Sequence, residues 1–181
     1  MLDLAIMGFL AEAPLHGYEL RRCVAQLTGH VRPVSDGSLY PAINRLERHG
    51  FLTRHVEQGS QGSVRRRHTL SLTSQGKDQL LGQLRNPGEK FITDRNRFNV
   101  VLAFLGLVPD VREQAAVLQR RREFLDQPAS YFTRGGKLVR AVDTPDRYRK
   151  GMLQVSRESR RAEIAWLDST LAELSAEASG G

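Results

Sequence analysis

The sequence is poor in cysteine and has no long apolar run. Its 181 residues contain a single cysteine, Cys23, which excludes a disulfide within the chain and leaves too few thiols for a metal cluster. The apolar stretch from Leu4 to Ala11 is far shorter than the roughly 18 apolar residues of a membrane-spanning helix, and no basic segment precedes it. We therefore expect a cytoplasmic protein with a reduced thiol and no membrane contact.

Residue sets typical of enzymes and metal sites are missing too. The five histidines all lie within the first 68 residues, and no two of them have ligand spacing on a helix. We find no nucleophile beside a base, no glycine-rich phosphate loop and no paired carboxylates. The sequence therefore predicts no enzymatic activity, no metal site and no cofactor.

Positive charge is what the sequence has in excess. The chain carries 27 Lys and Arg against 20 Asp and Glu, a formal net charge of +7. Such a balance indicates a polyanionic partner or an anionic surface, although many unrelated proteins are also basic. The apolar share of 40% is sufficient for a packed core.

Apolar spacing predicts three helices at the start of the chain. Two are expected at residues 2–11 and 16–29, and the third lies in the segment VSDGSLYPAINRLERHG. The third helix has two candidate caps, Ser35 and Ser38. We favour Ser38 because Pro41, which lacks an N–H, then falls in the first turn.

Strict alternation follows and predicts a β-hairpin with a basic flank. Its strands are expected at 51–58 and 64–72, joined by the flexible turn GSQG. Thr73 then caps a further helix, which ends at the breaker NPG.

The second half is predicted to be helical. Helices are expected at 93–107, at 110–125 and from Thr144, as N-cap, to about Ala176. The sequence therefore divides into a domain at residues 1–86, a helical domain at 90–176 and a flexible tail at 177–181.

Three helices followed by a basic hairpin are the layout of a winged helix-turn-helix. A major groove admits one α-helix, whose polar side chains meet base edges, while a basic hairpin reaches phosphates or an adjacent groove. We expect a mainly α fold with a small β-hairpin wing, in which an N-terminal winged helix-turn-helix precedes a helical C-terminal domain.

Three segments resemble the PadR family of bacterial transcriptional regulators: GFLAEAPLHGYEL, SDGSLYPAINRLERHGFL and RRHTLSLTSQGKDQL. The resemblance implies a homodimer that binds double-stranded DNA at a pseudo-palindromic operator and usually represses. It also implies dimerisation through a long C-terminal helix and, for several members, release by a small aromatic or drug-like effector. The sequence departs from the family at His68, where a wing tyrosine is usual, and at Ile43, where leucine is usual.

Exposed residues of the third helix and the wing are the candidate DNA contacts. Asn44 has an amide that can pair with adenine, whereas Tyr and Ser commonly reach phosphate. Arg45 and Arg48 are equally suited to ion pairs with Glu47 or Glu12, or to a solvated face. The proposed contacts are Tyr18, Ser38, Tyr40, Pro41, Asn44 and Arg45, with Arg65, Arg66 and Arg67 from the wing.

A regular apolar stripe on the last helix is the candidate dimer seam. With the apolar first helix, it gives the proposed interface residues Leu4, Ile164, Leu167, Leu171 and Leu174. The alternative is that the stripe packs against the helix at 93–107 of the same chain. Trp166 is either an interface anchor or the contact of a planar effector. Arg120, Arg121 and Arg122 are expected on a solvated face; the alternative is that they attract DNA or an acidic effector.

The sequence as a whole favours a DNA-binding transcriptional regulator over a winged-helix module that binds only protein. The discriminating feature is the proposed contact face of the third helix, which carries no acidic residue and lies beside a basic wing.

Overall fold

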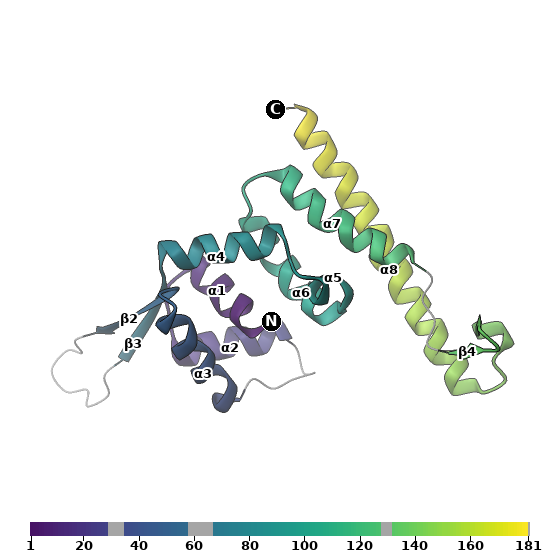
Figure 1. The fold of residues 1–181 in the computed structure, drawn as a ribbon, viewed down its shortest axis with the longest axis horizontal. Coiled ribbons are helices and arrows are strands. Elements are labelled where there is room, and N and C mark those ends of the chain that lie inside the picture. The colour runs from purple at the N-terminus through teal and green to yellow at the C-terminus, as the bar shows by residue number, and fades with distance from the viewer. Residues whose placement is uncertain (29–34, 58–66, 128–131, 181) are drawn as a thin grey trace. The chain divides into compact units, whose positions relative to one another are not determined.

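The computed structural model describes residues 1–28, 35–57, 67–127 and 132–180 (Figure 1). The described residues confirm the predicted fold class: a small antiparallel sheet and mostly helices, as in a winged helix-turn-helix with a helical C-terminal region. The chain forms two compact units, Met1–Pro109 and Asp110–Gly181.

The elements of the first unit, in chain order, are α1 (Leu2–Glu12), β1 (Leu15–His16), α2 (Gly17–Thr28), α3 (Asp36–Arg48), β2 (Leu52–Glu57), β3 (Arg67–Leu72), α4 (Ser74–Arg85), α5 (Glu89–Thr93), α6 (Arg95–Phe104) and the 3₁₀ turn η2 (Leu105–Leu107). Those of the second unit are α7 (Val111–Asp126), β4 (Thr133–Arg134), β5 (Lys137–Leu138), the 3₁₀ turn η3 (Ala141–Asp143) and α8 (Arg147–Gly180).

The core of the first unit is built around α1, which contacts α2, α3, α4, α6 and β3. Most of its residues are buried, as its nearly continuous apolar sequence requires. α6 approaches α1 at Gly8, where a Cβ would lie 2.5 Å from the Phe104 ring. This packing makes α6 part of the first unit, so the division between units falls after Pro109, beyond the predicted boundary at 86–90.

The start of α3 differs from the prediction. The helix begins at Asp36, and the amides of Ser38 and Leu39 both donate to the carbonyl of Ser35, at 3.0 and 3.1 Å. Ser35 is therefore the N-cap, and the choice of Ser38 was wrong. Pro41 consequently lies in the second turn, where its side chain is exposed and its missing N–H removes one backbone hydrogen bond of the helix.

The sheet has the order β1-β3-β2 and is antiparallel throughout. β2 and β3 form the predicted hairpin, with Leu52 opposite Leu72. β1 adds a short edge strand in which His16 pairs with Thr69, although the sequence placed this residue in a helix. Two residues are too few to show an alternating pattern, so this strand had no detectable signal.

Thr73 joins the end of α3 to the start of α4, as its predicted capping role requires. Its hydroxyl accepts from the Gly76 amide at 2.9 Å and donates to the Gly50 carbonyl at 2.7 Å. A side chain at Gly76 is excluded, because a Cβ there would lie 2.1 Å from the Phe51 carbonyl oxygen. Gly50 itself adopts a φ of 74° and ends α3.

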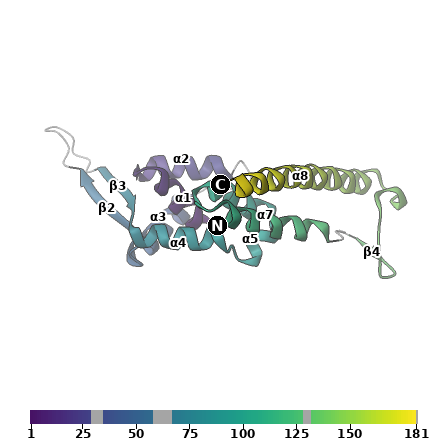
Figure 2. The same ribbon diagram turned by 90° about the horizontal axis from the view of Figure 1, so that it is seen from above.

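The second unit is a long antiparallel helix pair in which α7 lies along the C-terminal half of α8 (Figure 2). Asp110, the predicted start of this helix, is the N-cap of α7 and accepts from the Arg112 amide at 2.8 Å. The cap of α8 is Asp146, which accepts from two amides of the first turn. The predicted cap, Thr144, instead donates to the Arg140 carbonyl, so α8 starts later than expected. It also ends later, at Gly180.

Candidate nucleic-acid interface

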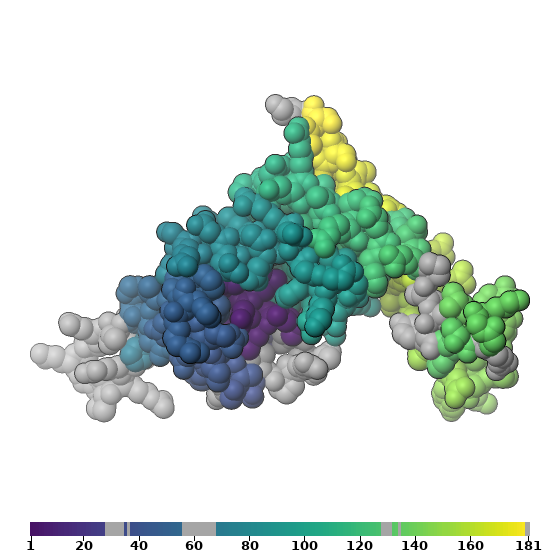
Figure 3. Space-filling view, viewed as in Figure 1, coloured from purple at the N-terminus to yellow at the C-terminus, as the bar shows by residue number. Residues whose placement is uncertain are grey.

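α3 places its apolar and polar residues on opposite sides. Leu39, Ile43 and Leu46 are buried, at the spacing i, i+4 and i+7 that keeps side chains on one face. The exposed side, named the α3 face, consists of Ser38, Tyr40, Pro41, Asn44, Arg45 and Arg48. The blue surface in Figure 3 belongs to α3 and β2. Every DNA contact predicted on this helix therefore lies at the surface.

The start of α2 lies against Tyr40 of this face and carries a second exposed tyrosine, Tyr18. A Cβ at Gly17 would lie 3.4 Å from the Tyr40 hydroxyl, so Tyr40 lies against the first residue of α2. Tyr18 is exposed and stacks on His16, with ring centroids 5.8 Å apart and planes at 10°. The His16 amide donates to Glu19 at 2.9 Å, and this hydrogen bond lowers the pKa of the Glu19 carboxyl.

Arg45 is held by an ion pair. Its guanidinium donates to Asp3 of α1 at 2.5 Å, and both side chains are partly exposed. The structure therefore shows a partner that differs from the two acids considered in the sequence, Glu47 and Glu12. The pair connects the α3 face to the central helix of the unit.

Arg54 of β2 belongs to the candidate interface, although it was not predicted from the sequence. One of its terminal nitrogens donates to Asn44 Oδ1 at 3.0 Å and to Glu47 Oε2 at 2.9 Å. Glu47, an acid on α3 next to the α3 face, is thereby paired with a cation. Arg48 approaches the same turn and donates to the Asn44 carbonyl at 3.4 Å.

The alternating pattern of β2 could have identified Arg54, because it places this residue on the side of the strand that carries Leu52. Leu52 is buried, and Arg54 lies two residues further along the strand, on the same side. Its partner across the ladder is Leu70, which is also buried. A partly exposed arginine on that side can reach the polar residues of the element packed beside the strand. Here that element is α3.

The wing arginines are only partly covered by the structure. Arg65 and Arg66 lie outside the described residues. Arg67 opens β3, where its backbone pairs with that of Glu57.

The predicted stripe on α8 faces α7 of the same chain. Leu167 is fully buried, while Ile164, Leu171 and Leu174 are half-buried. Hydrogen bonds from α7 to Glu163 and Asp168 flank Leu167, which places this side of α8 against α7. The predicted alternative to a dimer seam was packing within the chain, but against the helix at 93–107 and not against α7.

The neighbouring arginines of α7 have different environments. Arg121 is only 2% exposed and donates to Glu163 at 2.7 Å, so its expected place on a solvated face was wrong. Arg122 is partly exposed and donates to Asp168 at 2.6 Å and to Asp126 at 3.2 Å. These hydrogen bonds to two carboxylates raise the pKa of Arg122.

A second apolar stripe on α8 was not recognised in the sequence. Tyr148, Met152 and Val155 are 78%, 40% and 68% exposed, and Trp166 is about half exposed. The four positions follow alternating steps of four and three residues, with Ser159 and Ala162 completing the series. We call these four apolar residues the outer stripe.

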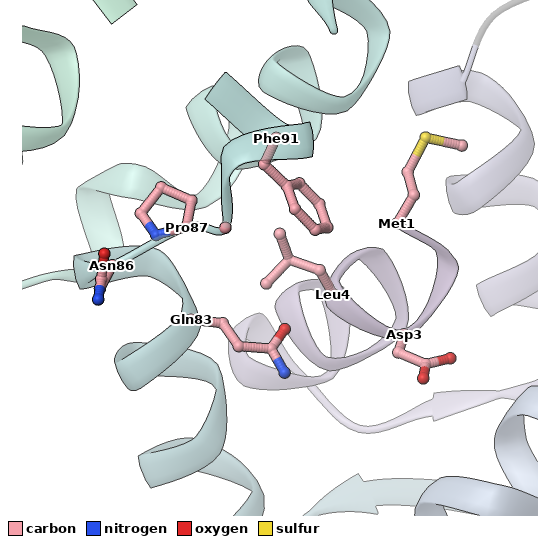
Figure 4. A pocket seen from close by; sticks show the side chains of 8 residues that line it. Met1, Asp3, Leu4, Gln83, Asn86, Pro87 and Phe91 are labelled. Atoms are coloured by element: carbon pink, nitrogen blue, oxygen red, sulfur yellow. The ribbon is translucent and has the colours of Figure 1, made fainter. Parts of the chain in front are cut away.

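A cavity of about 240 Å³ lies beside the first turn of α1 (Figure 4). Its walls combine Leu4, Phe91 and Pro87 with the polar side chains of Gln83 and Asn86. Leu4, predicted as a dimer contact, is buried in the core of its own protomer. The lining of this cavity comes from the first unit and does not include Trp166.

The described residues contain no cluster of three potential metal ligands. Within the same residues, no helix is both long and apolar enough to cross a bilayer.

Comparison with known proteins gives a family match over the first unit. Residues 6–81 match the model of the transcriptional regulator PadR-like family. No curated protein matches the sequence. Among solved structures, PadR of Bacillus subtilis in complex with operator DNA is 22% identical, with 96% of this chain and 98% of that chain covered and a TM-score of 0.43. The PadR-like regulator BC1756 of Bacillus cereus is 19% identical, with coverages of 98% and 99% and a TM-score of 0.41.

Proposed function

Since residues 6–81 of this chain belong to the transcriptional regulator PadR-like family, we propose that the protein binds a specific DNA sequence as a homodimer and represses transcription. The observation that carries this proposal is the α3 face. It is exposed, it bears no acid, and the neighbouring Glu47 is neutralised by Arg54. A helix with such a face suits the floor of a major groove.

The residues of the interface divide into two roles. Asn44, at the middle of the exposed side, contacts base edges. Ser38, Tyr40 and Tyr18 lie towards the starts of α3 and α2, where hydroxyls and backbone amides suit phosphate. Pro41 packs against the sugar-phosphate backbone, and Arg45, Arg65, Arg66 and Arg67 supply positive charge.

The outer stripe is our proposed dimer seam, in place of the residues buried against α7. α7 reaches only as far along α8 as Arg160, which donates to the Gln127 carbonyl. The first part of α8, from Arg147 onward, lies beyond the end of α7. It contacts η3, and Tyr148, Met152 and Val155 remain exposed there. Apolar residues at heptad spacing on an exposed helix suit the same helix of a second copy. Ile164, Leu171 and Leu174 are on the side of α8 that faces α7 and are not part of this seam.

If a small molecule releases the dimer from DNA, we propose that this effector binds at Trp166. Its indole is half exposed on the outer stripe, so a planar aromatic effector bound there would change the seam. Because Trp166 is the only tryptophan, its fluorescence reports such binding directly. Titration with planar aromatic acids such as p-coumaric acid should quench it, and a flat titration would remove Trp166 from the effector site.

The function is tested by selection from DNA duplexes with about 25 random base pairs, enough for two half-sites one helical turn apart. We expect a pseudo-palindromic consensus, bound about a thousandfold or more tightly than a scrambled duplex at about 0.15 M salt. Failure to enrich any sequence, with no binding even at low salt, would leave the second candidate, a winged-helix module that binds protein only.

A further inference from the structure

The hydrogen bond between Arg54 and Asn44 determines how the Asn44 side chain is presented. A guanidinium has donors and no acceptor, so the atom of the amide that faces it must be the oxygen. The distance of 3.0 Å from Arg54 to Asn44 Oδ1 fits this assignment. The amide nitrogen, Nδ2, is then on the side of the group turned away from Arg54.

Glu47 fixes Arg54 in turn. The nitrogen of Arg54 that binds Asn44 also donates to Glu47 Oε2 at 2.9 Å. Asn44 and Glu47 are three residues apart on α3, so they lie on adjacent positions of the helix surface. The guanidinium bridges them from β2, and the positive charge of Arg54 is balanced by the carboxylate.

From this arrangement we infer that Arg54 is a positioning residue for base recognition: it holds the Asn44 amide with Nδ2 outward, so that Asn44 selects a purine by donating to N7. This inference rests on the proposed function. N7 is an acceptor on both adenine and guanine in the major groove, and pyrimidines have none at that position. The second lone pair of Oδ1 stays available for the N6 amino group of adenine.

A direct phosphate contact by Arg54 is the competing role, and the two roles differ in measurable ways. A phosphate contact weakens binding to all sequences and reduces the salt dependence of binding by about one unit of slope. A positioning residue changes preference at one base pair and leaves the salt slope unchanged. Its effect also disappears once the residue that it positions has been removed.

The experiment starts from the consensus that wild-type protein selects from random duplexes. The same selection with Asn44→Ala identifies the base pair at which preference is lost. That purine is then replaced by its 7-deaza analogue, and binding is measured by fluorescence anisotropy for wild type, Arg54→Met, Asn44→Ala and the double variant. Arg48→Met is the matched control, because among the described residues Arg48 donates to the main-chain carbonyl of Asn44 and not to its side chain.

We expect the 7-deaza substitution to weaken wild-type binding by about 5- to 150-fold, the range of one good base contact. It should have little effect on Asn44→Ala or Arg54→Met, and Arg54→Met should add almost nothing to Asn44→Ala. Arg48→Met should keep the full 7-deaza effect. Circular dichroism establishes that each variant is folded, and Glu47→Gln, which leaves Arg54 in place, should give a partial loss.

Three results would overturn the inference. The first is an equal loss on consensus and scrambled DNA for Arg54→Met with a reduced salt slope. The second is additivity of the two substitutions, and the third is an Asn44→Ala selection that changes no position. If wild-type protein selects no consensus at all, the proposed function fails first and the inference falls with it.

Discussion

α3 and α8 are both amphipathic helices that bury one side in their own unit, but their exposed sides differ. The exposed side of α3 is polar, and two of its residues, Asn44 and Arg45, are held by side chains of other elements. The exposed side of α8 carries the outer stripe, which is apolar. Fixed polar groups suit hydrogen-bonded recognition of a groove, whereas an apolar helix face suits another helix.

The buried sides differ as well. The buried side of α3 is aliphatic, whereas α8 contacts α7 through Leu167 together with the buried pair of Arg121 and Glu163. A buried ion pair depends on both partners, because either charge left alone is poorly solvated. The helix pair of the second unit should therefore be more sensitive to single charge changes than α3 is.

The largest effect is expected from Arg121→Met, which leaves Glu163 mostly buried without its cation. We expect the second unit to lose about 3 kcal/mol of unfolding free energy, the lower end of the range for such changes, because Glu163 keeps some exposure. Urea unfolding followed by Trp166 fluorescence measures this unit.

Two variants sharpen that result. Adding Glu163→Leu to Arg121→Met should restore most of the lost stability, since apolar residues of similar size often replace a buried pair well. Arg122→Met, at the neighbouring position, should lower the unfolding free energy much less, because both of its carboxylate partners are exposed to solvent. Equal losses for Arg121→Met and Arg122→Met would contradict the contrast between the two arginines.

The two apolar sides of α8 are compared by Leu167→Ala and Val155→Ala. Leu167→Ala should cost about 2–5 kcal/mol of unfolding free energy at constant protein concentration, because it opens a cavity in the α7–α8 contact. Val155→Ala should leave protomer stability nearly unchanged and weaken self-association, measured by analytical ultracentrifugation. Unchanged association for Val155→Ala and for Val155→Asp would rule out the outer stripe as the dimer seam.

A smaller effect is expected on the α3 side from Asp3→Asn, which releases Arg45. An exposed pair such as this contributes less than about 1 kcal/mol to stability. Freed from its carboxylate, Arg45 should strengthen DNA binding and steepen the salt slope by about one unit. Asp78→Asn on α4 makes the same change in net charge and should alter neither. Weaker binding by Asp3→Asn would show that Asp3 holds Arg45 in its productive position.

Features that depend on residues close together in the sequence could be predicted, whereas contacts between distant residues could not. The stripe of Leu39, Ile43 and Leu46 and the cap at Thr73 depend on neighbours in sequence, and the structure confirms both. The partners of Arg45 and Arg121 come from residues 42 positions away in each case, and no local pattern identifies them. The two stripes of α8 overlap in sequence, so only the position of α7 shows which one stays exposed.

The smallest expected effect concerns two carboxyls whose pKa values are lowered in different ways. Glu19, in the first unit, accepts from the His16 backbone amide, whereas Asp143, in the second, accepts from the charged Arg140 side chain. Because both pKa values are depressed on folding, the associated stabilisation is present above the unfolded values of about 4 and is lost as the pH falls through the folded ones.

Salt at about 1 M, which shortens the screening length to about 3 Å, should raise the pKa of Asp143 more than that of Glu19. Carboxyl carbon chemical shifts, followed by NMR between acid and neutral pH, measure both groups in one sample. Arg140→Gln should remove most of the lowering of the Asp143 pKa. His16→Asn keeps the backbone amide donor and should preserve most of the lowering of the Glu19 pKa. Equal salt responses of the two pKa values would mean that a charged partner dominates at both sites.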